Sequence, residues 1–333
     1  MYYDYESFTG LRNSMTKTII VTLLTALISF VVCPLSGLSQ SEPDKQKQRV
    51  RTVSIPISIF TKKELKEGQA AEFVQAERLI VKEDREEQTI LSIRSITDAP
   101  LALAILVQED LASNFNLQIK DIAAFIRNLP KGSRVMVAYV RGGNLQIRQK
   151  FTDDLEAAAK ALRIVTSSSA GAPRNPYDGV IDALNRFDAL PAGRRAILLV
   201  SDGLDISQGV SGSSPGQSID LDRAILRAQR RSVAIYSFYS PASLTENGDS
   251  RLILNGQGSL QKLSDETGGR AFFQGSIAPI SFDPFFKDLR ILLNRQFLLS
   301  YLSTHMKRGY HRVEVLSTNP EVKIEYPRGY YYR

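Results

Sequence analysis

A cluster of polar side chains directly follows an unbroken run of aliphatic residues in the first half of the chain. The run covers residues 101–107, and Gln108, Glu109, Asp110 and Ser113 follow it. Such a run is typical of a buried parallel strand, and an α/β sheet binds its ligand at the carboxyl ends of its strands. Amide, carboxylate and hydroxyl groups can bind a cation or the polar groups of a partner. We therefore expect a binding site in this stretch.

A second aliphatic run has acidic side chains at the same place. Residues 195–200 form this run, and Asp202 and Asp205 follow it. With Glu109 and Asp110, these residues could bring several carboxylate oxygens to one edge of a sheet, as Mg²⁺ or Ca²⁺ requires. If such a cation site exists, Asp110 and Asp202 are its predicted ligands. In the alternative interpretation these side chains cap strand ends and neighbouring backbone, and no metal or other cofactor is bound.

The composition is typical of a globular protein with mixed surface charge. The chain has 333 residues, of which 43% are hydrophobic, enough for one large core with a smaller one beside it. Its formal net charge is +7, but the 42 basic and 35 acidic residues are interleaved. Nucleic-acid binding needs basic residues gathered on one face, so we expect no nucleic-acid partner.

The N-terminal residues have the features of an export signal. Lys17 precedes an apolar stretch over residues 19–32, which has the length of a signal-peptide core but is short for a membrane span. Gly37 and Ser39 are small residues that fit a cleavage site after Ser39. We expect residues 1–39 to be a signal peptide or, if uncleaved, an N-terminal anchor and the one contact with a membrane. The protein is then exported, and it is periplasmic, secreted or anchored.

The remaining chain divides into four parts by composition and pattern. The sole cysteine, Cys33, is lost if the signal is cleaved, so the mature chain would have no cysteine and no disulfide would hold it. Ser, Pro, Gln and charged residues then predict a linker. The expected parts are a linker over 40–50, an N-terminal β segment over 51–98, an α/β domain over 99–294 and a C-terminal β segment over 295–333.

The two β segments are expected to pack together as one small β-sandwich-like domain. Alternating apolar residues predict strands at both ends of the chain, separated by turns. Because the N-terminal strands precede the central aliphatic run, they do not fit a simple alternation of strands and helices. The expected strands are 53–60, 77–81 and 89–95 in the first segment, and 297–302, 311–316 and 322–326 in the second.

Strands and helices alternate through the middle of the chain. This alternation predicts a doubly wound, mostly parallel, Rossmann-like α/β sheet. Thr152 is expected as the N-cap of the helix that follows it. Besides the strand at residue 101, the expected strands are 134–139, 145–151, 195–200, 232–239 and 271–273, and the expected helices are 117–129, 154–162, 177–187, 218–230, 260–267 and 284–293.

A series of short motifs accompanies these elements along the chain. They are Ile90, Ile93 and Ala99-Pro100-Leu101, then Phe151-Thr152-Asp153, Tyr177-Asp178, Val200-Ser201-Asp202-Gly203, then Leu263, Thr267-Gly268-Gly269 and Phe272, and finally residues 296–301. The order of these motifs resembles a von Willebrand factor type A (VWA) domain, in particular the bacterial exported VWFA-related proteins. The resemblance covers about residue 53 to the C-terminus and implies the same α/β fold.

The metal-ion-dependent adhesion site of the VWA family is degraded in this sequence. The family pattern needs Asp-x-Ser-x-Ser after the first strand, because a hard divalent cation takes hydroxyl and carboxylate ligands. If Gln108 takes the first place, Asp110 and Ala112 fall on the serines. If Asp110 takes it, Ala112 and Asn114 fall there. Neither alignment keeps both hydroxyl groups.

The other two loops of the family site are also incomplete. Asn175 precedes Pro176 where the family has a threonine, whereas Asp202 matches the aspartate of the third loop. The resemblance implies that a protein ligand contacts loops 108–113, 166–175 and 202–210. The predicted binding residues are Gln108, Glu109, Asp110, Ser113, Asn175, Asp202 and Asp205.

We expect a non-enzymatic, adhesion-type module of the cell envelope that binds another protein without a metal ion. Three alternatives stay open. The first is binding that depends on Mg²⁺ or Ca²⁺ through a rearranged site, the second is a hydrolase that uses carboxylates at the sheet edge, and the third is a purely structural protein of the cell envelope. A Ser-His-Asp enzyme is disfavoured, because His305 and His311 lie far along the chain from the candidate carboxylates and are expected to be exposed. The terminal residues 330–332 are three tyrosines, which we expect to dock on the β domain.

Overall fold

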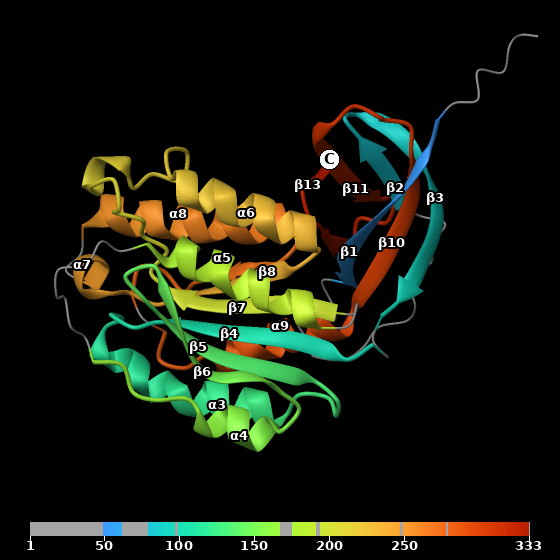
Figure 1. Ribbon diagram of the computed structural model, residues 1–333. Helices are drawn as coiled ribbons and strands as arrows, with labels where there is room; N and C mark the ends of the chain where they lie inside the picture. Colours follow the sequence, from blue (N-terminus) through green and yellow to red (C-terminus); the bar gives the residue numbers. More distant parts are fainter. Residues whose placement is uncertain are drawn as a thin grey trace, which may run out of the picture. The chain divides into compact units, whose positions relative to one another are not determined.

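The computed structural model describes residues 49–61, 79–96, 99–166, 175–190, 194–246, 249–277 and 279–332. The predicted signal peptide or anchor over 1–39, and the linker up to residue 48, lie outside these residues. Among the helices that are described, none is both long and apolar enough to span a membrane. The described strands form two sheets (Figure 1).

One sheet has six strands in the order β6-β5-β4-β7-β8-β9, and its neighbouring strands are parallel except for the antiparallel pair β5 and β6. Its central strand β4 (Leu101–Gln108) is buried at every residue, as a strand covered on both faces must be. The predicted fold class, a doubly wound and mostly parallel α/β sheet, is therefore confirmed. The other strands are β5 (Arg134–Arg141), β6 (Asn144–Thr152), β7 (Arg194–Ser201), β8 (Ala234–Tyr239) and β9 (Ala271–Phe272).

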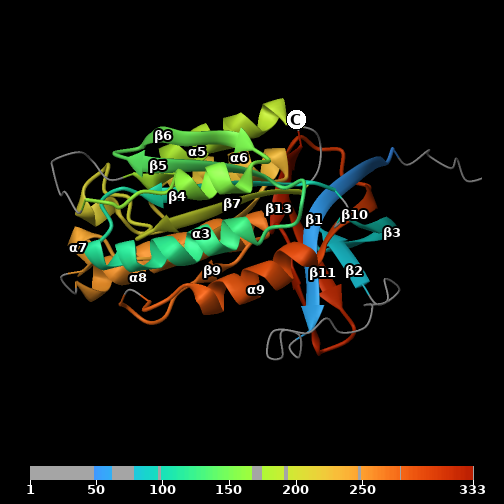
Figure 2. The same ribbon diagram turned by 90° about the horizontal axis from the view of Figure 1, so that it is seen from below.

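Alternate side chains of β4 enter two separate hydrophobic cores. Leu103 and Ile105 pack with residues of α3, α4 and α9, whereas Ala104 and Leu106 pack with α5, α6 and α8. Figure 1 shows the sheet with α5, α6 and α8 above it and α3 and α4 below it, and Figure 2 shows α3 and α9 on the face turned toward the viewer. The helices are α3 (Ile119–Arg127), α4 (Leu155–Lys160) and α9 (Asp283–Asn294) on one face, and α5 (Pro176–Arg186), α6 (Ile219–Arg231) and α8 (Ser250–Thr267) on the other.

The other sheet is built from strands of both chain ends, as expected. Its seven strands run in the order β12-β1-β10-β3-β2-β11-β13, and its neighbouring strands are antiparallel. They are β1 (Arg51–Thr61), β2 (Leu79–Glu83), β3 (Glu86–Ser95), β10 (Gln296–Ser303), β11 (Gly309–Ser317), β12 (Val322–Glu325) and β13 (Gly329–Tyr332).

This seven-stranded sheet curls over its own inner face. Ile57, Val81, Leu299 and Val313 come from β1, β2, β10 and β11, yet they belong to one hydrophobic cluster. At the rim, Arg51 of β1 donates a hydrogen bond to the Tyr330 hydroxyl of β13, although these strands lie far apart in the strand order. The two halves of the sheet thus share a core, as in a sandwich.

Two expectations about helix ends were wrong, the N-cap of α4 and the start of α8. Asp154, not Thr152, caps α4, because its carboxylate accepts a hydrogen bond from the backbone N–H of Ala157 at 2.9 Å. Helix α8 begins ten residues before the expected start at Leu260; its first half carries Asn255, Gly256 and Gly258, which weaken the helical signal. The terminal tyrosines dock by pairing as strand β13 with β11. Short turns of helix complete the fold: η2 (Ser113–Gln118), η3 (Phe187–Ala189), η4 (Val210–Gly212) and α7 (Ser243–Glu246).

Candidate functional site

The predicted site residues lie where β4 and β7 end, which we call the carboxyl edge of the six-stranded sheet. Gln108 is the last residue of β4, and Asp202 directly follows the last residue of the adjacent parallel strand β7. Adjacent parallel strands end at the same edge of a sheet, so Gln108 and Asp202 are hydrogen-bonded although they lie 94 positions apart in the sequence.

The side-chain amide of Gln108 is the centre of this edge. Its Nε2 donates to Asp110 Oδ1 at 2.9 Å and to Asp202 Oδ1 at 3.1 Å. Its Oε1 accepts from the Ser201 hydroxyl and, at 3.2 Å, from the backbone N–H of Asp202. All four hydrogen-bonding places of this buried amide are therefore used.

The orientation of the Gln108 amide follows from its partners. If oxygen and nitrogen were exchanged, the amide nitrogen would face the N–H of Asp202, and the amide oxygen would face two carboxylates. Both contacts would be repulsive, so the network admits one orientation. The two N–H groups of Gln108 thus occupy the space between the carboxylates of Asp110 and Asp202.

Asp202 is fully buried and has partners on both oxygens. Besides Gln108, its Oδ1 accepts from the backbone N–H of Leu204 at 3.1 Å, and its Oδ2 lies 3.4 Å from the Thr245 hydroxyl. The loop after Asp202 sits directly on α8, where a Cβ at Gly256 would come within 2.1 Å of the Asp202 carbonyl oxygen. This close approach fixes the position of the carboxylate.

Asn175 organises a second part of the edge, at the start of α5. Its Oδ1 caps the helix by accepting from the N–H of Tyr177, and its Nδ2 donates to Asp178 Oδ2 at 3.0 Å and to Asp220 Oδ2 at 2.7 Å. Burial and the nearby charge of Asp220 raise the pKa of Asp178. One neutral amide thus holds two acidic side chains together.

Asp205 is hydrogen-bonded to residues of its own loop and to the N-cap of α6. It accepts hydrogen bonds from the N–H and hydroxyl of Ser207 at 3.0 and 2.7 Å, and from the Ser218 hydroxyl at 2.6 Å. Ser218 in turn is the N-cap of α6, since its Oγ accepts from Leu221 N–H. Asp205 therefore ties the loop after β7 to the start of α6.

Glu109 and Ser113 do not join the Gln108 network. Glu109 turns toward Arg163, with which it forms an ion pair, and its other oxygen lies 3.8 Å from Arg141 Nε. Ser113 is exposed at the start of η2. Both remain candidates for contact with a partner, but neither shares hydrogen bonds with Asp202 among the described interactions.

The residues present do not fit the cation site that the VWA family uses. A hard cation needs several oxygen ligands that point to a common centre. At this edge, the N–H groups of Gln108 point between Asp110 and Asp202 instead. Ala112, at a serine position in either alignment, has no oxygen in its side chain and is buried.

Three polar residues of this edge were not among the predicted site residues. Ser201 and Thr245 contact Gln108 and Asp202, and Asp220 contacts Asn175. The position of Ser201 at the end of an aliphatic run was a usable signal. Thr245 lies 43 positions from Asp202 and Asp220 lies 45 positions from Asn175, so no local pattern could connect them.

The expectation that both histidines are exposed was wrong. His311 is 3% exposed, and its ring lies 5.9 Å from that of His305 between centroids. Both rings lie beside Glu83, a buried residue of β2. Strand pairing between β2 and β11 brings these residues together, and the local sequence carries no signal of that pairing.

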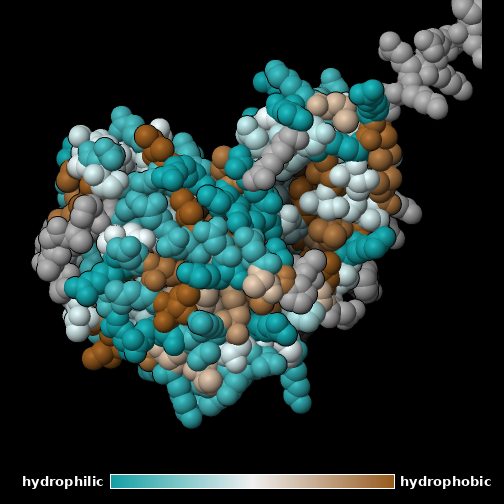
Figure 3. All heavy atoms as spheres, viewed as in Figure 1, coloured by the Kyte–Doolittle hydropathy of each residue, from teal (hydrophilic) through white to brown (hydrophobic). Residues whose placement is uncertain are grey.

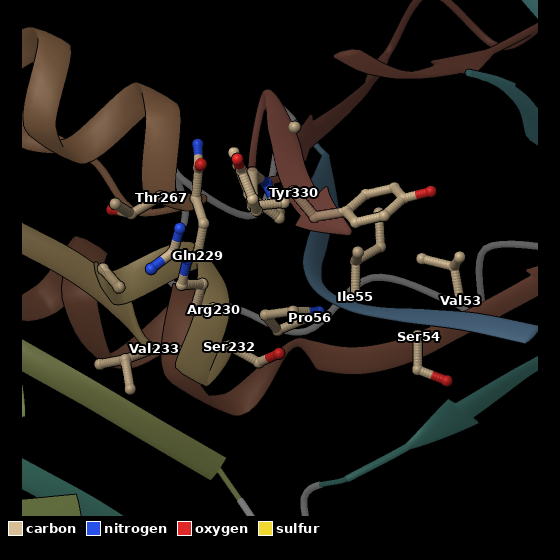
Figure 4. Close-up of a pocket in the computed structure, with 14 residues that line it drawn as sticks. Val53, Ser54, Ile55, Pro56, Gln229, Arg230, Ser232, Val233, Thr267 and Tyr330 are labelled. Atoms are coloured by element: carbon tan, nitrogen blue, oxygen red, sulfur yellow. The ribbon is translucent and has the colours of Figure 1, made fainter. Parts of the chain in front are cut away.

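A separate small cavity opens beside the start of β1. Figure 4 shows Pro56, Gln229 and Tyr330 around it, from β1, α6 and β13. Its volume is about 160 Å³, and no predicted site residue lines it. On the face seen in Figure 3, hydrophilic residues dominate over α5, α6 and α8, whereas hydrophobic residues gather on the seven-stranded sheet.

The strand order and the two helical layers define the class of this protein: a doubly wound α/β fold with one antiparallel edge strand, in the manner of VWA domains. No family model matches the chain, and no curated protein matches it. Similar solved structures do include VWA domains, as the sequence resemblance implied.

Three of these structures show the extent of the likeness. An aerotolerance-related membrane protein from Bacteroides fragilis has 14% identity and a TM-score of 0.41 over 58% of this chain and 98% of its own. BatB from Bacteroides thetaiotaomicron has 14% identity and a TM-score of 0.41, over 57% and 95%. A von Willebrand factor type A protein from Catenulispora acidiphila has 12% identity and a TM-score of 0.38, over 84% and 73%. The fold class itself rests on the strand order of this chain.

Proposed function

We propose that the chain is a non-enzymatic, VWA-like module of the cell envelope that binds another protein at its carboxyl edge without a divalent ion. The observation that carries the proposal is the Gln108 amide between the carboxylates of Asp110 and Asp202. In this proposal the partner contacts the loops at 108–113, 166–175 and 202–210; residues 167–174 of the second loop lie outside the described residues.

The hydrogen-bond network supports metal-independent binding. A buried carboxylate needs a cation or several N–H and O–H donors to offset the loss of its hydration. Asp202 obtains its donors from Gln108 and the backbone of Leu204. A cation at the same place would have to displace the amide of Gln108 and break four hydrogen bonds.

Exposed apolar side chains on the surrounding loops support a protein partner. Val210 in η4 is 42% exposed, Ile219 at the start of α6 is 69% exposed, and Leu244 lies exposed in α7. Val210 lies in the loop that contains Asp205, Ile219 directly precedes Asp220, and Leu244 directly precedes Thr245, whose hydroxyl lies 3.4 Å from Asp202 Oδ2. Apolar residues within a polar rim are typical of a protein-binding surface.

Site-specific photo-crosslinking in cells of the native host tests the proposal. A photoreactive residue replaces Val210, and in a control it replaces Leu316 on β11, which is also 42% exposed. We expect Val210 to crosslink a protein that Leu316 does not, and the purified partner to bind the full chain equally in EDTA and in Mg²⁺. Binding that requires Mg²⁺, or a crosslink from Leu316 alone, would contradict the proposal.

A further inference from the structure

The two histidines of this 333-residue chain meet two carboxylates at one corner of the seven-stranded sheet. Glu83 ends β2, Asp84 forms the turn after it, and His305 and His311 come from the loop after β10 and from β11. One atom each of Glu83, Asp84 and His311 lie within 4.8 Å of one another. This corner is separate from the carboxyl edge, and the proposed function does not use it.

The hydrogen bonds of His311 leave one ring nitrogen directed at the carboxylates. Its Nε2 lies 2.7 Å from the carbonyl oxygen of Lys307, which can only accept, so Nε2 carries a proton. Its Nδ1 then faces Asp84 Oδ2 at 2.8 Å and Glu83 Oε1 at 3.3 Å. Nδ1 is therefore the ring nitrogen that can bind a metal ion together with these two carboxylates.

Glu83 also has capacity for a further ligand. It is fully buried; its Oε1 accepts hydrogen bonds from Ser303 and Tyr330, whereas its Oε2 has no hydrogen-bond partner in the described structure. The ring nitrogen Nδ1 of His305 is likewise unpartnered and lies 3.7 Å from Glu83 Oε1. A buried carboxylate oxygen without a donor is costly unless a cation binds there.

The net charge of the corner favours a cation. Glu83 and Asp84 supply two negative charges, and Arg51, 3.6 Å from Glu83 Oε1, supplies one positive charge. The carboxylate of Glu86, 3.5 Å from His305 Nε2, adds a third negative charge on the solvent side. Asp84 is partly exposed, so an ion can enter at the turn.

We propose that Glu83, Asp84 and His311, with His305 as a fourth donor, bind a divalent transition-metal ion of the Zn²⁺ type. Neighbouring ligands of tetrahedral zinc lie about 3.3 Å apart when each bond is about 2.0 Å long. His311 Nδ1 lies 2.8 Å from Asp84 Oδ2 and 3.3 Å from Glu83 Oε1, and His305 Nδ1 lies 3.7 Å from Glu83 Oε1. These separations bracket the value expected for zinc ligands. Imidazole and carboxylate together suit such an ion, and the bond from His311 to a backbone carbonyl is the usual support of a metal-binding histidine.

The backbone holds the Asp84 carboxylate in place for this role. Asp84 and Arg85 both have positive φ, 49° and 77°, which is the geometry of a two-residue hairpin turn. Asp84 also exchanges backbone and side-chain hydrogen bonds with Arg312 of β11. The metal would therefore join the β2–β3 turn to the loop before β11.

Metal titration of the full chain tests this site. The chain is first freed of metal with EDTA and then given Zn²⁺ or Co²⁺. We expect it to retain one Zn²⁺ per molecule on gel filtration and to unfold at a higher temperature with Zn²⁺ than without it. With Co²⁺ we expect the visible absorption of tetrahedral cobalt. Asp84→Asn keeps a side chain that tolerates positive φ, and His311→Gln keeps a donor for Lys307. Each should weaken Zn²⁺ binding by roughly tenfold or more.

Asp188→Asn is the matched control, because it removes the same charge from an exposed ion pair with Arg231. It should bind Zn²⁺ as the unchanged chain does. The proposal is overturned if the unchanged chain neither retains Zn²⁺ nor gains stability from it. Equal binding by Asp84→Asn and the unchanged chain would also overturn it. The titration of the unchanged chain decides the matter even if a variant does not fold.

Discussion

At the scale of single residues, the carboxyl edge depends on a neutral donor between two acids. The Gln108 amide satisfies carboxylate oxygens of Asp110 and Asp202, and its own oxygen is satisfied by Ser201 and the backbone. Sequence placed these residues at one edge correctly, because the ends of adjacent parallel strands coincide. It could not show which way the amide turns, since that depends on the backbone N–H of Asp202, 94 positions away.

Gln108→Glu tests this role of the amide. The substitution keeps the shape but replaces two N–H donors by a third carboxylate in a buried cluster, so we expect the free energy of unfolding at neutral pH to fall by about 3 kcal/mol. Millimolar Mg²⁺ should recover part of the loss, because a cation can then take the place of the donors. Chemical denaturation with and without Mg²⁺ measures both effects.

Gln146→Glu is the control for this substitution, since Gln146 is exposed on β6. It should change the free energy of unfolding by less than about 0.5 kcal/mol. If Gln108→Glu were as stable as the unchanged chain without added cation, the amide would not have the role assigned to it.

At the scale of elements, the position of the Asp202 carboxylate depends on how closely α8 approaches the loop after β7. Gly256 allows this approach, and the same glycine weakens the helical pattern in the sequence. The start of α8 was missed for that reason. The carboxyl half of α8, where Leu260 and Leu263 are buried at helical spacing, was predicted correctly.

Gly256→Ala should destabilise the protein although alanine is the better helix former. Its Cβ would meet the backbone of Asp202, which cannot move aside as a side chain can, so we expect a loss of about 1–3 kcal/mol. Gly258→Ala in the same helix is the comparison, because its Cβ would meet only the Pro215 ring at 3.0 Å. Thermal unfolding of both variants should place Gly256→Ala clearly below Gly258→Ala; the reverse order would argue against the close packing of α8.

Asp178 of α5 and Asp220 of α6 lie close together, and this should make the stability of the folded protein depend on pH. Burial and Asp220 raise the pKa of Asp178, so the folded protein holds that proton more tightly than the unfolded chain does. The contribution of Asp178 therefore becomes less favourable as the pH rises from the ordinary aspartate pKa, about 4, through the raised value. Asp178→Asn should raise the unfolding midpoint at neutral pH, and the gain should vanish as the pH falls toward 4. A gain that is the same at both pH values would contradict this assignment.

At the scale of the whole molecule, the described strands form two sheets, and the sequence predicts one of them better than the other. Strands β4, β5, β7 and β8 were predictable because buried strands are nearly continuous apolar runs, as in β4. For the seven-stranded sheet, the sequence predicted that strands of the two chain ends pack together but not which strands pair, since the alternation of apolar residues identifies a strand but not its partner. The cluster at Glu83 and His311 follows from the pairing of β2 with β11 and was therefore missed.

Thermal unfolding of the full chain in EDTA, then in millimolar Mg²⁺, Ca²⁺ or Mn²⁺, tests the central claim most directly. The Asp84→Asn chain is the one to use, because it removes the proposed transition-metal site from the measurement. A specific cation site at the carboxyl edge would stabilise the fold by about 2.7 kcal/mol at a hundredfold excess over its dissociation constant. The account predicts no saturable shift of the midpoint. A saturable rise that a further Asp202→Asn substitution abolishes would contradict it and make the carboxyl edge a metal-dependent binding site.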